Sequence, residues 1–93
     1  MTDQTRILLV EDEVITASSL KMGLESAGYR VCPLATRGDL AIKIALSEKP
    51  DVILMDVNLA GKLNGIETAK AILKSLQTKI ISLTGYHDDE IIS

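Results

Sequence analysis

The chain has 93 residues, a length that suits one domain, and its 46% hydrophobic and 25% charged residues form an ordinary globular mixture that can build a core. Its net charge of −3 comes without a basic block, which argues against direct binding to nucleic acid or to an anionic membrane. No apolar run approaches the roughly 20 residues of a membrane span, and the N-terminus lacks the basic start of a signal peptide. Cys32 is the single cysteine, so it cannot form an internal disulfide and is expected to be a small buried hydrophobe in a cytoplasmic protein.

The first half of the chain predicts a strand, a helix and a second strand. Residues 7–10 form a continuous apolar run, which is typical of a strand buried on both faces. The helix that follows should end at Gly28. Its apolar side chains are expected to share one face: Ile15, Leu20, Leu24 and Ala27. Residues 29–35 predict a second strand, and because Pro33 within it cannot donate a ladder hydrogen bond, this strand should lie at an edge of the sheet.

The alternation continues in the second half. Residues 38–48 predict a second helix with an inward apolar face: Leu40, Ala41, Ile44 and Ala45. Residues 52–55 predict another doubly buried strand, and residues 79–84 a fourth strand. Between these strands, a third helix should start near Gly65 with five apolar positions: Ile66, Ala69, Ile72, Leu73 and Leu76. Strands that alternate with helices give an α/β fold with a parallel sheet and helices on both faces.

The fourth predicted strand is apolar on both faces, because it contains Ile80, Ile81 and Leu83, and this is the character of an interior strand. An interior strand needs a neighbour on each side, and the strand with Pro33 is the only edge candidate. We therefore expect residues 1–93 to form one domain that is C-terminally incomplete, by a strand and a helix of roughly 30 residues. The open fourth strand then predicts a homodimer or higher oligomer through strand pairing, or a marginally stable fold.

Acidic and hydroxyl side chains follow three of the predicted strands. Glu11 and Asp12 follow the first strand, Asp56 follows the third, and Thr84 ends the fourth. The carboxyl ends of parallel strands meet at one edge of the sheet, which is where ligands bind in open sheets of this kind. Two simpler interpretations stay open. The acidic residues 11–13 can be helix N-terminal acids, and Asp56 and Thr84 can be ordinary turn residues.

Such a cluster has a specific chemistry. Neighbouring carboxylates raise one another's pKa unless a cation is present, and Mg²⁺ takes one or two carboxylates while sharing phosphate oxygens. A carboxylate beside this metal can attack phosphorus as a nucleophile and form an aspartyl phosphate. The Thr84 hydroxyl can donate a hydrogen bond to a phosphate oxygen. The sequence therefore predicts a site for phosphoryl transfer.

Four motifs, in this order and at these spacings, resemble the receiver domain of two-component response regulators, including the chemotaxis regulators: Ile-Leu-Leu-Val-Glu-Asp-Glu at 7–13, Asp-Val-Ile-Leu-Met-Asp at 51–56, Asn-Gly at 64–65 and Ser-Leu-Thr-Gly at 82–85. The resemblance covers nearly the whole chain. It implies a flavodoxin-like, doubly wound parallel sheet with strand order 2-1-3-4, in which the fifth strand and helix of the family are absent from this chain.

The resemblance also implies the role of each site residue. Asp56 matches the phosphoacceptor, which takes a phosphoryl group from a histidine kinase or phosphotransfer protein. Asp12 matches the main Mg²⁺ ligand, with Glu11, Asp56 and the backbone carbonyl of Asn58 as its partners. Thr84 matches the switch hydroxyl, whose movement alters a surface read by a downstream effector protein. The implied protein is a regulator that assists its own phosphorylation and dephosphorylation and is not otherwise an enzyme.

Two departures and two alternatives accompany this prediction. The family's lysine at the end of the fifth strand has no counterpart, because the chain ends first and neither Lys62 nor Lys79 matches it. The loop after Asp56 also lacks the family's common Met-Pro pair. One alternative is an interaction-only remnant that cannot switch. The other is an aspartyl-phosphate phosphatase, which is disfavoured because such enzymes commonly carry a second aspartate where this chain has Asn58.

Overall fold

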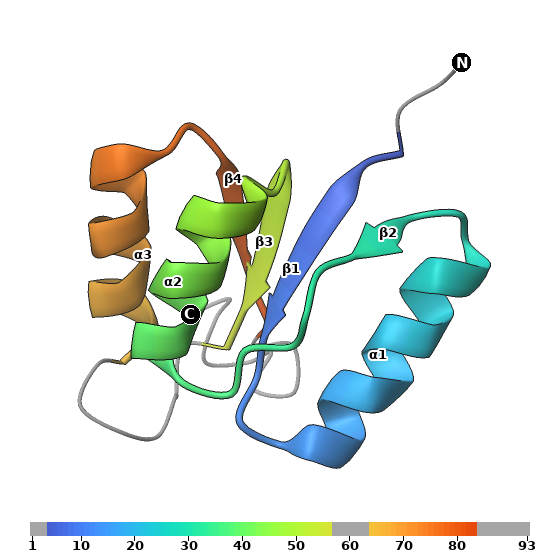
Figure 1. Ribbon diagram of the computed structural model, residues 1–93. Helices are drawn as coiled ribbons and strands as arrows, with labels where there is room; N and C mark the ends of the chain where they lie inside the picture. Colours follow the sequence, from blue (N-terminus) through green and yellow to red (C-terminus); the bar gives the residue numbers. More distant parts are fainter. Residues whose placement is uncertain (1–3, 57–63, 84–93) are drawn as a thin grey trace, which may run out of the picture.

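The computed structural model describes residues 4–56 and 64–83. Strands and helices alternate within these residues, as the sequence predicts, and Figure 1 shows their arrangement. The elements in chain order are β1 (Arg6–Val10), α1 (Val14–Ser26), β2 (Arg30–Val31), α2 (Gly38–Glu48), β3 (Val52–Met55), α3 (Gly65–Ser75) and β4 (Lys79–Ser82). None of the helices in this part of the chain has the length and apolarity that a bilayer crossing requires.

The four strands form one parallel sheet in the order β2-β1-β3-β4, which confirms the predicted fold and strand order. β3 pairs with β1 along its whole length, from Val52 beside Ile7 to Met55 beside Val10. The chain reverses its winding direction between these two strands, so their carboxyl ends flank the topological switch point. The fold thereby places the residues that follow Val10 and Met55 next to each other.

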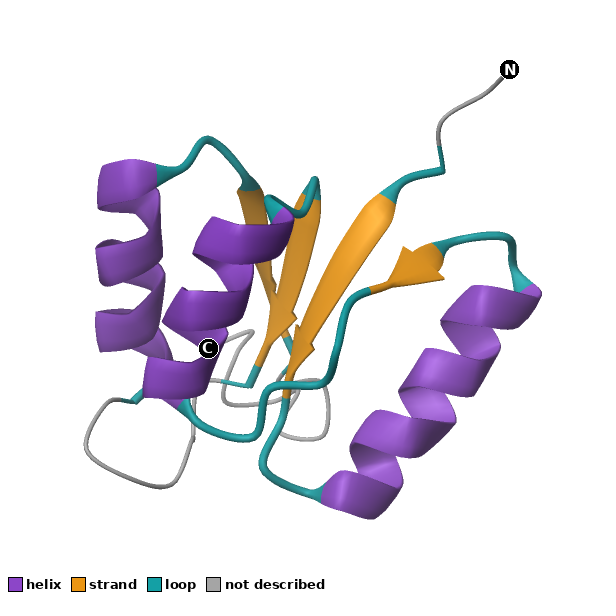
Figure 2. Ribbon diagram, in the orientation of Figure 1, coloured by secondary structure: helices purple, strands orange, loops and turns teal. Residues whose placement is uncertain are grey.

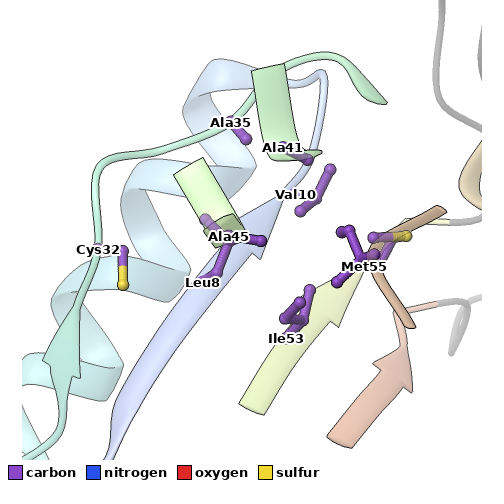
Figure 3. Packing of buried hydrophobic residues seen from close by; sticks show 9 residues of the cluster. Leu8, Val10, Cys32, Ala35, Ala41, Ala45, Ile53 and Met55 are labelled. Carbon is purple, nitrogen blue, oxygen red and sulfur yellow. The ribbon is translucent and has the colours of Figure 1, made fainter. Parts of the chain in front are cut away.

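The main core lies between the sheet and two helices, α2 and α3, which lie together on one side of it (Figure 2). Alternate residues of β1 and β3 point into this layer, and Figure 3 shows Leu8, Val10, Ile53 and Met55 packed near Ala41 and Ala45 of α2. The small alanines allow α2 to approach the strands closely. The predicted inward face of α2 is confirmed, because Leu40 and Ile44 are also packed against this cluster. Cys32 is buried in the cluster as expected.

Helix α1 packs against β1 and β2, apart from the other two helices (Figure 1). It ends as predicted, with Gly28 in the left-handed conformation at φ +97° just beyond the helix. The predicted inward face was partly wrong, because Ile15 is 82% exposed and Ala27 is also exposed. The inward positions are Ala17, Leu20 and Leu24, which lie three and four residues apart on one side of the helix. Ile15, five residues before Leu20, lies off that side.

Helix α3 begins with a capping box, in which the Asn64 side chain accepts a hydrogen bond from the Glu67 N–H and the Glu67 carboxylate accepts one from the Asn64 N–H. Ile72 is buried, and Ala69 and Leu76 pack against the core. Ile66 and Leu73, the other two apolar positions named for this helix, are 59% and 52% exposed. Thr68 occupies the inward position between them and is fully buried, because its hydroxyl donates to the Asn64 carbonyl at 2.7 Å.

Both outer strands differ from the predicted ranges. β2 has only two residues, yet pairing with β1 resumes at an isolated bridge between Val10 and Ala35. Pro33 lies in the interruption, which agrees with its missing N–H and with the predicted edge position of this strand. At the other edge, Ile80 packs on the core while Ile81, on the opposite face of the sheet, is 46% exposed. Within the described residues, β4 is therefore an outer strand with an uncovered apolar face.

Candidate acidic phosphoacceptor site

Glu11 and Asp12 directly follow β1, before the helix begins. The Glu11 N–H donates to the Ala35 carbonyl at 3.0 Å, which extends the pairing of β1 beyond its last residue. The first turn of α1 contains no acidic residue, and the Glu13 carboxylate instead accepts a hydrogen bond from the Thr16 hydroxyl at 3.1 Å. Glu11 and Asp12 are thus positioned by the sheet and are not the helix-turn acids of the simpler interpretation. Sequence reasoning did not single out Ala35, which holds this segment through its backbone alone.

Asp56 directly follows β3 and is fixed in the same way. Its N–H donates to the Val10 carbonyl at 2.9 Å, so its backbone is tied to the end of the neighbouring strand. The side chains of Asp56 and Glu11 are only 8% and 9% exposed. Acidic side chains are rarely this buried unless they have partners, so the burial points to a specific role at this edge.

The three carboxylates converge as the sequence predicts. Glu11, Asp12 and Asp56 each offer an oxygen within 4.8 Å of the others. The pKa of Glu11 is raised from 4.5 to about 7. Burial is the largest cause, followed by the hydrogen bond and negative charge of Asp56 and by a hydrogen bond with Asp12. At neutral pH, the Glu11 carboxyl is therefore only partly ionised, first because it is buried and then because Asp56 lies beside it.

This donor set fits a hard divalent cation. Carboxylate oxygens are the ligands that Mg²⁺ prefers, and a cation among Glu11, Asp12 and Asp56 would offset the repulsion that raises the pKa of Glu11. A typical Mg²⁺ site has only one or a few carboxylate ligands and leaves other positions to water and phosphate oxygens. The cluster lies at the switch point of the parallel sheet, where this class of fold binds its ligands.

The remaining predicted site residues, Asn58 and Thr84, lie outside the described residues, as does Lys62. Leu83, which precedes Thr84 in the sequence, donates its N–H to the Met55 carbonyl at 2.8 Å. The hydrogen bonding between β3 and β4 therefore extends to Met55 and Leu83, which directly precede the predicted site residues Asp56 and Thr84 in the sequence.

An apolar rim lies beside the acidic cluster and was missed by the sequence analysis. Val14 and Ile15 are 62% and 82% exposed, and together with Asp12 and Glu13 they line a hollow of about 460 Å³. Large apolar side chains beside an acidic site offer contact area to a protein partner. The signal in the sequence was the position of these two residues immediately after the acidic run, before the inward-facing Ala17.

Known proteins share both the sequence and the fold. Residues 7–93 match the family model described as the response regulator receiver domain. The chain is 40% identical over 85 residues to the alkaline phosphatase synthesis transcriptional regulatory protein PhoP of Bacillus subtilis, covering 90% of this chain and 35% of PhoP. The chain spans 31% of the length of the phyllosphere-induced regulator PhyR of Methylorubrum extorquens, at 35% identity, and 61% of the length of protein PilH of Pseudomonas aeruginosa, at 37% identity.

Solved structures agree. The response regulator domain of Thermotoga maritima CheB superposes with a TM-score of 0.81 at 36% identity, over 86% of this chain and 60% of that chain. PhyR of Bartonella quintana, crystallised with the anti-sigma factor NepR, superposes with a TM-score of 0.77 at 29% identity, over 85% of this chain and 33% of that chain. With the predicted strand order and the converging carboxylates, these matches show that the chain belongs to the response regulator receiver domain family of two-component signalling systems.

Proposed function

We propose that this receiver domain is controlled by phosphorylation of Asp56, with the phosphoryl group supplied by a histidine kinase or a phosphotransfer protein. The observation that carries the proposal is the convergence of Glu11, Asp12 and Asp56 at the switch point of the sheet. A buried carboxylate beside two other carboxylates has little reason to persist unless positive charge or phosphoryl chemistry is handled there.

The transfer step needs one nucleophile. An oxygen of the Asp56 carboxylate forms a bond to phosphorus while the bond from phosphorus to the donor's imidazole nitrogen breaks, and the histidine leaves with that electron pair. The backbone hydrogen bond from Asp56 to Val10 fixes the position of the nucleophile before the donor arrives. Water can later attack the same phosphorus and release phosphate, which restores the carboxylate. In this sense the domain assists its own phosphorylation and dephosphorylation without acting on another substrate.

Asp12 and Glu11 would hold Mg²⁺ together with Asp56 and the backbone carbonyl of Asn58. When bound, the ion offsets the negative charge that gathers around the transferring phosphoryl group. Glu11 contributes through its charge state, because its carboxyl must release its proton before it can serve as an anionic ligand. Thr84 would supply the switch hydroxyl that donates to a phosphate oxygen.

We further propose a cytoplasmic protein that signals to an effector protein and does not bind nucleic acid directly. The net charge of −3 without a basic block supports the last point. The PhyR–NepR structure supports a protein as the reader, since a receiver-containing relative there binds a protein partner. Residues 1–93 would form one receiver domain. An interaction-only remnant that does not switch is the competing proposal, and a phosphorylation assay distinguishes the two.

Intact-mass measurement with acetyl phosphate and Mg²⁺ tests this proposal. The chain should gain one phosphoryl group, and Asp56→Asn should gain none. Asp39→Asn is the matched control, because Asp39 is an exposed aspartate of α2 paired with Arg37, and this variant should be labelled like the original chain. Absence of labelling in the original chain would favour the non-switching remnant, and equal labelling of Asp56→Asn would refute the assignment of the acceptor.

A further inference from the structure

A second charged hollow lies at the edge of the sheet opposite the acidic cluster. It has a volume of about 400 Å³ and is lined by Gln4, Arg6, Arg30, Lys49 and Asp51. Arg6 and Arg30 begin β1 and β2, and Lys49 and Asp51 lie in the connection from α2 to β3. All of these residues therefore lie at the amino-terminal ends of the strands, whereas Glu11, Asp12 and Asp56 follow the carboxyl ends.

The charge of this hollow opposes that of the chain as a whole. Three of its five lining residues are cations and one is an anion, in a protein of net charge −3. The Asp51 carboxylate accepts a hydrogen bond from the backbone N–H of Arg6 at 2.8 Å, so part of its acceptor capacity is already used. Within residues 4–56 and 64–83 the ion pair that forms is Arg37 with Asp39, and none of the three cations of the hollow has a carboxylate partner.

The walls of the hollow are held in place. The Arg6 guanidinium donates from Nη1 to the Glu48 carbonyl at 2.9 Å, and the Gln4 side chain donates to the Gly28 carbonyl at 3.0 Å. Lys49 has a left-handed backbone at φ +50°, where glycine would be the more favourable residue by roughly 1 kcal/mol. The chain thus carries a positive side chain at a position where backbone energetics alone would favour glycine.

We propose that this hollow binds a compact, multiply charged oxyanion of the phosphate class, free in solution. Two arginine forks and a lysine provide charge-assisted donors that match phosphate oxygens. Among the described residues, the lining contains no aromatic or large aliphatic side chain that would hold a nucleobase or an acyl chain. The volume is in the range of small-ligand sites. This site is separate from the phosphoacceptor site and does not depend on the function proposed for Asp56.

Inorganic pyrophosphate is the probe, and amide NMR shifts in Mg²⁺-free buffer at fixed ionic strength are the measurement. The expected shifts are at residues 4–6, 28–31 and 48–51. Arg30→Gln and Lys49→Gly should each weaken binding about tenfold, because each removes a charged donor. Lys49→Gly also suits the left-handed backbone, so its effect cannot come from unfolding. Lys43→Gln, an exposed lysine of α2 outside the lining, is the matched control and should bind as before.

Several outcomes would overturn the proposal. Shifts confined to residues 10–13 and 56 would place the anion at the acidic cluster, at the carboxyl ends of the strands. If Lys43→Gln weakened pyrophosphate binding as much as the lining variants do, the anion would be responding to the total charge of the protein and not to a specific site. ATP serves as a second probe, and a higher affinity for ATP than for pyrophosphate would contradict a compact oxyanion, because it would require contacts to the nucleoside.

Discussion

Replacing Glu11 with glutamine should remove part of the pH dependence of the stability of the metal-free domain. Glu11 is 9% exposed and its pKa is raised from 4.5 to about 7, first by burial and then by Asp56. Because the pKa is higher in the folded state, folding favours the protonated form. The stability that this proton provides is fully present below about pH 4.5 and is lost as the pH rises to about 7.

The magnitude follows from the shift. At roughly 1.4 kcal/mol per pKa unit, the interval from 4.5 to about 7 corresponds to roughly 3 kcal/mol of unfolding free energy. That is a large part of the 5–15 kcal/mol typical of a whole domain, taken as an order of magnitude. Glutamine keeps the shape and a hydrogen-bonding group but cannot ionise, so Glu11→Gln should gain stability relative to the original chain as the pH rises.

Urea unfolding at about pH 5 and about pH 8 in the presence of a chelator measures this difference. The stability of Glu11→Gln minus that of the original chain should increase by roughly 2.5 kcal/mol between the two pH values, because a small part of the effect is already lost at about pH 5. Glu25→Gln, which removes an exposed glutamate of α1, is the control and should show little change. Saturating Mg²⁺ at about pH 8 should stabilise the original chain more than Glu11→Gln. An unchanged difference across this pH range would refute the raised pKa of Glu11.

Three further changes test other parts of the account. Asp12→Asn should weaken Mg²⁺ binding in calorimetry by about tenfold or more, because it removes an anionic ligand, and unchanged affinity would place the ion elsewhere. Ile81→Lys should reduce self-association in sedimentation experiments, since it puts a charge on the uncovered face of β4, whereas a stable monomer with a cooperative melt at high temperature for the original chain would contradict association through this strand. Asn64→Ala should lower the unfolding free energy by about 1 kcal/mol in urea titrations, because it removes the cap of α3, and no loss would mean that the capping box contributes nothing.

Sequence periodicity was sufficient for the order of elements and for the core around α2, because buried strands and a regular helical pattern leave few alternatives. Residues 38–48 show this best, since the alanines at 41 and 45 are both fully buried in the predicted place. The strand order came from the resemblance to receiver domains and was confirmed by the pairing of β1 with β2 and β3. Convergence of Glu11, Asp12 and Asp56 then followed from parallel strands that end at one edge.

The errors arose at positions where an apolar side chain is exposed or a polar side chain is buried. Ile15 was placed on the inward face of α1 because it is aliphatic, but it is 82% exposed and lies on a different face of the helix. Thr68 shows the opposite case, because a polar residue becomes fully buried once its hydroxyl bonds to the preceding turn. The basic hollow could not be predicted from charge patterning, since Arg6, Arg30 and Lys49 are far apart in the sequence and meet only when the strands align.

The central claim is that Asp56 receives the phosphoryl group, and the most direct test identifies the modified residue. The chain is treated with acetyl phosphate and Mg²⁺, the acyl phosphate is reduced with borohydride, and the peptides are sequenced by mass spectrometry. Reduction of an aspartyl phosphate leaves homoserine, and the account predicts homoserine at position 56 and at no other aspartate. Homoserine at Asp12 in place of Asp56 would contradict the account, because the nucleophile and the metal ligand would then have been exchanged.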